Sequence, residues 1–66
     1  MTKAHPVGNE IKEFRMKRGW TQAYTALQLG ISLRTVVALE VGSERKPRPL
    51  TLAKIHLAMQ SIEKAA

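Results

Sequence analysis

The sequence predicts an all-α fold, a small domain of four to five helices. Its 66 residues suffice for one domain with a small core. Apolar residues recur at helical spacing in several segments, and Gly19, Gly30 and Gly42 stand where such segments end. Ser, Thr or Asn residues stand where helices are expected to begin.

Two short helical patterns in the middle of the chain are separated by a three-residue turn. Thr21 is a good N-cap for a helix that runs to about Leu29, and Gly30 suits the left-handed conformation that ends such a helix. Ser32 is placed to cap the next helix, and the small Ala26 lets the two helices approach closely. An apolar wedge between them consists of Ile31, Val36 and Leu39. This arrangement predicts a helix-turn-helix motif.

The helix after Ser32 has two faces of different character. At about 100° per residue, one face carries Thr35, Val36, Leu39 and Glu40. The other face carries Leu33, Arg34, Val37, Ala38 and Val41. If the first face packs on the core, the second points outward with a single charge, although a solvated face is usually richer in charge. Either the helix is buried all round, or this face enters a DNA groove, where aliphatic side chains touch thymine methyls and Arg34 bonds guanine. In so short a chain the groove is the favoured interpretation.

The N-terminal residues 1–8 are expected to form a flexible arm, because Pro6 and Gly8 interrupt any helical pattern. The helix-turn-helix domain would then occupy residues 9–66.

The first helix is expected over residues 9–18, with Ile11 and Phe14 one turn apart on its inner face. Trp20 follows the helix at once. A lone aromatic residue at this place is expected to cap the core, and stacking on a nucleic-acid base is the less favoured alternative.

A basic loop follows the second helix of the motif. Arg45, Lys46 and Arg48 lie within four residues, and two prolines stiffen the path. Such residues usually coat a solvated loop, but this loop directly follows the expected reading helix. Contact with DNA phosphates is therefore the better interpretation.

The last helix is expected from Leu50 to about Glu63. Its apolar stripe consists of Leu52, Ile55, Met59 and Ile62, widened by Leu50, Ala53 and Leu57. The stripe is wider than one core contact needs. Met59 and Ile62 are therefore candidates for a homodimer interface, although in a small domain they would also serve to close the core.

The composition favours a polyanionic partner, since the net charge is +6 and the pI is near 10.4. The chain has no Cys, which excludes disulfides and thiolate metal sites. No signal-peptide pattern and no apolar run of bilayer length are present. We therefore expect a soluble, cytoplasmic, nucleoid-associated protein with no membrane contact.

Enzymatic function is not expected. The chain has no Asp, and its two histidines, His5 and His56, belong to no evident triad, acid/base pair or metal-ligand spacing. No glycine-rich phosphate loop is present, so no cofactor is expected. His56 is interpreted as a residue at the edge of the core.

The motif residues together resemble the lambdoid repressor/Cro type of helix-turn-helix, also called the xenobiotic-response-element family. The resemblance covers about residues 9–60. It is carried by Lys17-Arg18-Gly19-Trp20, Thr21-Gln22, Ala26, Leu29-Gly30-Ile31-Ser32, Arg34-Thr35-Val36, Leu39-Glu40 and Gly42. Two departures stand out. Tyr24-Thr25 replace an acidic residue and Leu, and the reading face lacks the Gln and Asn that many relatives use for adenine.

The resemblance implies roles for individual residues. Gln22 matches a glutamine that bonds a phosphate and braces the reading helix, and Arg15 and Glu40 match an ion pair between the first and third helices. The positions that face base edges are matched by Leu33, Arg34, Val37 and Ala38. Ser32 matches a cap that contacts the DNA backbone, and Lys46-Pro47-Arg48 is similar to a loop that grips phosphates. We expect backbone contacts from Thr21, Gln22, Ser32, Thr35, Arg45, Lys46 and Arg48.

From these observations we expect a transcriptional repressor of the Cro type, as found in phages and plasmids, acting as a homodimer on double-stranded DNA. It would occupy a palindromic operator without a small-molecule effector, so its concentration would control it. The main alternative is an antitoxin-like or accessory protein that uses the same fold to bind a protein. A basic RNA-binding module is less favoured because exposed stacking aromatics are lacking.

Overall fold

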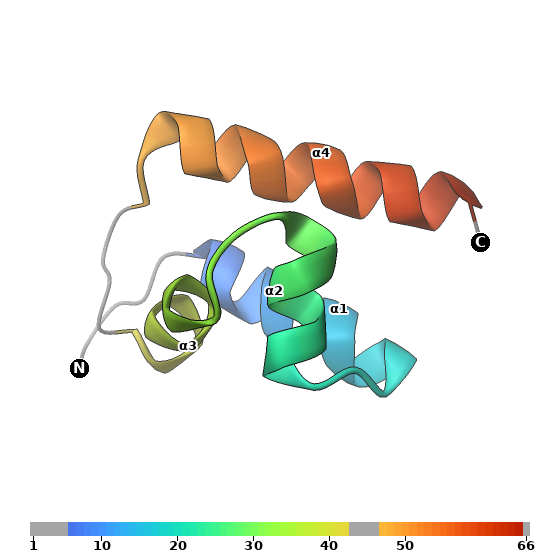
Figure 1. Ribbon diagram of the computed structural model, residues 1–66, viewed down its shortest axis with the longest axis horizontal. Coiled ribbons are helices and arrows are strands. Elements are labelled where there is room, and N and C mark those ends of the chain that lie inside the picture. The colour runs from blue at the N-terminus through green and yellow to red at the C-terminus, as the bar shows by residue number, and fades with distance from the viewer. Residues whose placement is uncertain (1–5, 43–46, 66) are drawn as a thin grey trace.

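A computed structural model describes residues 6–42 and 47–65, which form four α-helices and no strand. The helices are α1 (Pro6–Arg18), α2 (Gln22–Leu29), α3 (Leu33–Val41) and α4 (Pro49–Ala65). Helix α3 packs against both α1 and α2, while α4 lies along one side of the group and packs on α2 (Figure 1). The all-α fold predicted from the sequence is confirmed.

The helix-turn-helix forms as its caps predict. Thr21 is the N-cap of α2 and Gly30 its left-handed C-cap, with φ of 73°. Ser32 is the N-cap of α3, and Gly42 ends that helix with φ of 81°. Because these signals are local in the sequence, they fix the ends of both helices to the residue.

Helix α1 begins three residues before the expected Asn9, so the prediction of an arm that extends to residue 8 is wrong. Pro6 starts the helix, because a proline at the first helical position has a suitable φ and lacks an N–H that would have no partner there. Val7 is fully buried, and Gly8 is buried against α3. The expected arm residues 1–5 lie outside the described residues.

The core lies where all four helices meet. Its buried apolar side chains are Val7, Ile11, Phe14, Ala26, Leu29, Val36, Leu39, Ile55 and Met59. Trp20 packs against this core, as predicted, and makes edge-to-face contacts with Phe14 and Tyr24, with ring centroids 5.7 and 5.0 Å apart. The buried Thr25 donates its hydroxyl to the Thr21 carbonyl at 2.8 Å, so this departure from the family pattern leaves no buried polar atom unpaired.

Helix α4 corrects the expected dimer surface. Met59 is only 9% exposed within the core, so it does not belong to a spare apolar surface, whereas Ile62 is half-buried where it packs against the core. The residues expected to widen the stripe point elsewhere, because Leu57 lies about 200° around the helix from Ile55. Leu50 and Leu57 are 75% and 66% exposed.

The predicted edge position of His56 is also visible in the structure. His56 on α4 is exposed, and its Nε2 lies 3.3 Å from the Oε1 of Glu10 on α1.

Among the described helices, none is long and apolar enough to cross a membrane. Residues 6–42 and 47–65 also hold no cluster of three acidic or histidine side chains that would suit a metal ion.

Candidate nucleic-acid interface

Helix α3 presents the two faces that its sequence predicts. On the inner face, Val36 and Leu39 are fully buried. On the outer face, Arg34 is exposed, and Leu33 and Val41 are 47% and 68% exposed. The smaller Val37 and Ala38 are half-buried. An aliphatic surface with one guanidinium therefore faces away from the core, and the alternative of a helix buried all round is wrong.

The N-terminus of α3 is fixed by a side-chain cap. The Ser32 hydroxyl oxygen accepts a hydrogen bond from the backbone N–H of Thr35 at 3.1 Å, and the two hydroxyl oxygens lie 2.8 Å apart. Ser32 is exposed and Thr35 is half-buried. Both hydroxyls therefore lie at the start of the helix that carries the outer face.

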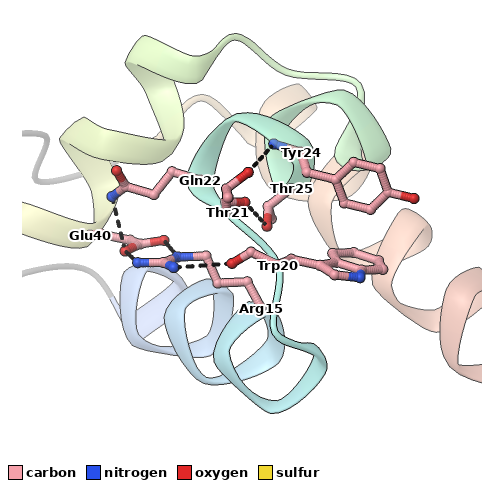
Figure 2. Close-up of polar contacts among 7 residues, drawn as sticks. All are labelled: Arg15, Trp20, Thr21, Gln22, Tyr24, Thr25 and Glu40. Atoms are coloured by element: carbon pink, nitrogen blue, oxygen red, sulfur yellow. Dashed lines mark hydrogen bonds and ion pairs between the residues drawn. The ribbon is translucent and has the colours of Figure 1, made fainter.

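The inner side of α3 is anchored through the carboxylate of Glu40, whose side chain is only 4% exposed. Arg15 of α1 donates from Nε to Oε2 at 2.7 Å and from Nη2 to Oε1 at 2.9 Å. Gln22 of α2 donates from Nε2 to Oε1 at 3.2 Å. Figure 2 shows these side chains converging from the three helices. Glu40 therefore links α3 to both α1 and α2.

This geometry lowers the pKa of Glu40. Burial by itself raises the pKa of a carboxyl, but hydrogen bonds from Arg15 and Gln22, together with the positive charges of Arg15 and Lys12, outweigh that effect. The same hydrogen bond raises the pKa of Arg15. Arg15 also donates from Nη1 to the Trp20 carbonyl at 3.3 Å, which ties the pair to the link before α2. The ion pair expected between Arg15 and Glu40 is therefore present, and both groups are charged at neutral pH.

The start of α2 lies beside this anchor. The Thr21 hydroxyl oxygen accepts from the backbone N–H of Tyr24 at 3.0 Å, and Thr21 is exposed. Gln22 is half-buried with its amide nitrogen on Glu40, so it braces α3 through that carboxylate. Contact of either residue with a phosphate stays a prediction.

The basic loop is described only in part. Arg45 and Lys46 lie outside the described residues. Pro47 is buried, whereas Arg48 is exposed and its carbonyl accepts from the backbone N–H of Leu52 at 2.9 Å, at the start of α4. The Arg48 side chain is therefore accessible to a partner while its backbone belongs to the folded domain.

Comparison with known families agrees with this architecture. A model of the helix-turn-helix family matches residues 11–63, which include all of α2 and α3 and most of α1 and α4. The chain belongs to the helix-turn-helix family. The match confirms the resemblance to the lambdoid repressor/Cro type, and the chain is a DNA-binding transcription regulator. No curated protein and no solved structure matched it.

Sequence reasoning missed two features of this helix-turn-helix protein. The resemblance implied that Gln22 braces the reading helix, but not that it does so by a hydrogen bond to Glu40, because that bond depends on how α2 and α3 are placed. Gly8 was interpreted as a break in the helical pattern, although it packs closely on α3. It stands between Val7 and Ile11, which are buried one helical turn apart. A small residue beside such an apolar pattern is a signal for close helix packing.

Proposed function

We propose that this regulator is a Cro-like repressor that binds a palindromic operator as a homodimer, with α3 in the major groove. The observation that carries the proposal is the outer face of α3. Its exposed aliphatic side chains and one guanidinium are presented by a helix whose opposite face is anchored through Glu40. A rigidly held helix of this kind suits a major groove, which admits an α-helix.

The side chains on this face suggest a division of roles. Arg34 is the one described outer-face residue with strong hydrogen-bonding capacity, and its guanidinium suits the O6 and N7 atoms of guanine. Leu33, Val37 and Ala38 suit thymine methyl groups. At the rim, the hydroxyls of Ser32, Thr35 and Thr21 and the amide of Gln22 would contact the DNA backbone, where such groups fix the protein's register.

The basic loop would add sequence-independent affinity. Arg48 is exposed, and with Arg45 and Lys46 it supplies three positive charges between α3 and α4. Neutralised phosphates release counterions, so these contacts would strengthen binding at low salt without selecting a sequence.

The small size of the DNA contact that one copy makes supports a homodimer. One helix in one groove contacts only a few base pairs, whereas two copies related by a two-fold axis contact two half-sites about one helical turn apart. Since Met59 and Ile62 belong to the core region, the available apolar residues of α4 are Leu50 and Leu57. A second copy that covers these leucines would form the dimeric repressor. The dimer would block a promoter by occupying its operator.

The experiment that tests this function is selection from a random DNA pool, followed by binding measurements on the enriched duplex and on a scrambled duplex of equal length and composition. We expect a symmetric motif and at least about a 10³-fold preference for it at physiological salt. Enrichment of no motif, or equal affinity for both duplexes, contradicts the proposal.

A second candidate function is favoured by the same exposed leucines of α4. Leu50 and Leu57 would suit the apolar surface of a different protein, as in an antitoxin-like or accessory role. The two functions differ in salt dependence, because phosphate contacts weaken steeply as salt rises while an apolar protein interface does not. Steep salt dependence on the selected duplex favours the repressor.

A further inference from the structure

Gly8 is buried where the first turn of α1 meets the backbone of α3. A Cβ added at this position would lie 2.9 Å from the carbonyl carbon of Leu39 and closer still to its oxygen. Both distances are well inside the 3.4 Å at which ordinary contact begins. The obstacle is backbone, so no side-chain rotation relieves it. Only a residue without a Cβ fits between the two helices as they stand.

The conformation of Gly8 does not explain its presence. Gly19, Gly30 and Gly42 have positive φ, but Gly8 lies within the right-handed helix α1, where alanine is intrinsically the more stable residue. A Cβ on Gly19 or Gly30 would meet no atom within 4 Å. Unlike Gly19 and Gly30, Gly8 therefore serves to let two helices touch.

Two of the contacts between α1 and α3 lie at separate places along α1. The backbone of Gly8 lies against Leu39, and the side chain of Arg15 pairs with the next residue, Glu40. Along α1 these two places are seven residues apart, roughly 10 Å. A backbone contact sets a distance, while a long ion pair adjusts to small changes. The contact at Gly8 therefore determines how closely α3 approaches this end of α1.

We infer that Gly8 is a positioning residue for DNA reading, because it sets the orientation in which α3 presents Leu33, Arg34 and Val37. This inference rests on the proposed function, in which those side chains meet base edges. A side chain at position 8 pushes the α3 backbone away at Leu39, five residues from Arg34 and in the same rigid helix. Paired hydrogen bonds from one guanidinium to one guanine depend on that geometry.

Contacts with phosphates are less sensitive to such a shift. Those of the basic loop come from long side chains, such as Arg48, and from charge that acts over distance. Gly8→Ala therefore lowers selectivity more than it lowers sequence-independent affinity. If Gly8 had a purely structural role, its substitution would change only the stability of the protein. The folded variant would then keep the wild-type ratio of sequence-specific to sequence-independent affinity.

The test compares the duplex selected by the wild-type protein with a scrambled duplex, for the wild type and three variants. The control for Gly8→Ala is Asn9→Ala, which places an alanine in the same helical turn at an exposed position. Ile55→Val removes one methylene from the core on α4 and so lowers stability without adding an atom against α3. Each protein is first shown to be folded by helical circular dichroism and by the fluorescence of its single tryptophan, Trp20.

We expect Gly8→Ala to reduce the preference for the selected duplex by about tenfold, equivalent to about 1.4 kcal/mol, with little change on the scrambled duplex. The two control variants keep the wild-type preference. An unchanged preference for folded Gly8→Ala overturns the inference, since the first turn of α1 would then have yielded while α3 stayed in place.

If Gly8→Ala is unfolded in buffer, all four proteins are measured in trimethylamine oxide, which favours compact states. Failure to fold even there also overturns the inference, because Gly8 would then serve the whole fold and not the orientation of α3. The proposed function fails separately, in the wild-type protein, if that protein shows no preference for any duplex.

Discussion

Arg15 and Glu40, which are 25 residues apart in the sequence, meet in a two-pronged ion pair with N–O distances of 2.7 and 2.9 Å. The side chain of Glu40 is 4% exposed and that of Arg15 is 18% exposed. Such a pair differs from a solvated surface pair, because loss of one partner leaves a buried charge without its counterion. The orientation of α3 therefore depends on a contact made on the side opposite to its outer face.

We expect removal of either partner of this pair to destabilise the fold by about 3 kcal/mol. Arg15→Ala, Glu40→Gln and the double variant form a mutant cycle, measured by urea unfolding followed through Trp20 fluorescence. The double variant should lose much less than the sum of the single variants, because both remove the same interaction. Lys17→Ala, on the exposed side of α1, is the control and should stay within about 0.5 kcal/mol of the wild type. If the losses of unfolding free energy in the two single variants add up in the double variant, Arg15 and Glu40 do not stabilise the fold through each other.

The lowered pKa of Glu40 predicts acid sensitivity. Its stabilising contribution is fully present above the pKa of an unfolded glutamate, about 4.3, and is lost as pH falls through the lower folded value. We expect the difference in unfolding free energy between the wild type and Glu40→Gln to be constant from pH 7 to about pH 5 and to shrink below about pH 4. Urea titrations across this range check it. A difference that shrinks between pH 7 and pH 5 would contradict the direction of the shift.

Arg48 is expected to contact phosphate and not bases. Arg48→Ala should reduce the slope of log K against log salt by about 1 while the selected motif stays the same, and Arg45→Ala and Lys46→Ala should behave alike. Lys64→Ala, at the far end of α4, is the matched control and should leave the slope unaltered. If all three loop variants keep the wild-type slope, the loop is ordinary solvated surface.

Dimer formation is expected to depend on the exposed leucines of α4. Leu57→Lys should weaken cooperative occupation of the two half-sites, because it places a charge in the apolar contact. Met16→Lys, which replaces an exposed apolar side chain on α1 by the same lysine outside α4, should bind nearly as the wild type does. Sedimentation on operator DNA gives the stoichiometry, and footprinting gives the cooperativity. One protein bound per asymmetric site at saturation would rule out the dimer.

Local signals made much of the fold predictable from the sequence. Thr21, Gly30, Ser32 and Gly42 act through neighbours within a few residues, so the ends of α2 and α3 followed from residue type alone. The split of α3 into a buried and an exposed face also followed, since one helical period determines both. The candidate site was predictable for the residues whose position depends on a face of α3 or on an N-cap.

Features that depend on packing between helices were harder to predict. Gly8 was interpreted as a breaker because the sequence does not show that α3 covers it. Pro6 was interpreted in the same way, although a proline also suits the first position of a helix, which it occupies here. On α4 the apolar residues surround most of the helix, so only the packing of the other helices decides that Met59 is buried and Leu57 is exposed. Local pattern does not contain that information.

The central claim, that the outer face of α3 reads bases through Arg34, is tested most directly by the affinity of Arg34→Ala for the selected and the scrambled duplex. We predict a loss of about 1–3 kcal/mol on the selected duplex, a much smaller loss on the scrambled duplex, and flattened preference at one base pair in each half-site. Equal losses on the two duplexes would make Arg34 a phosphate contact and would contradict the account.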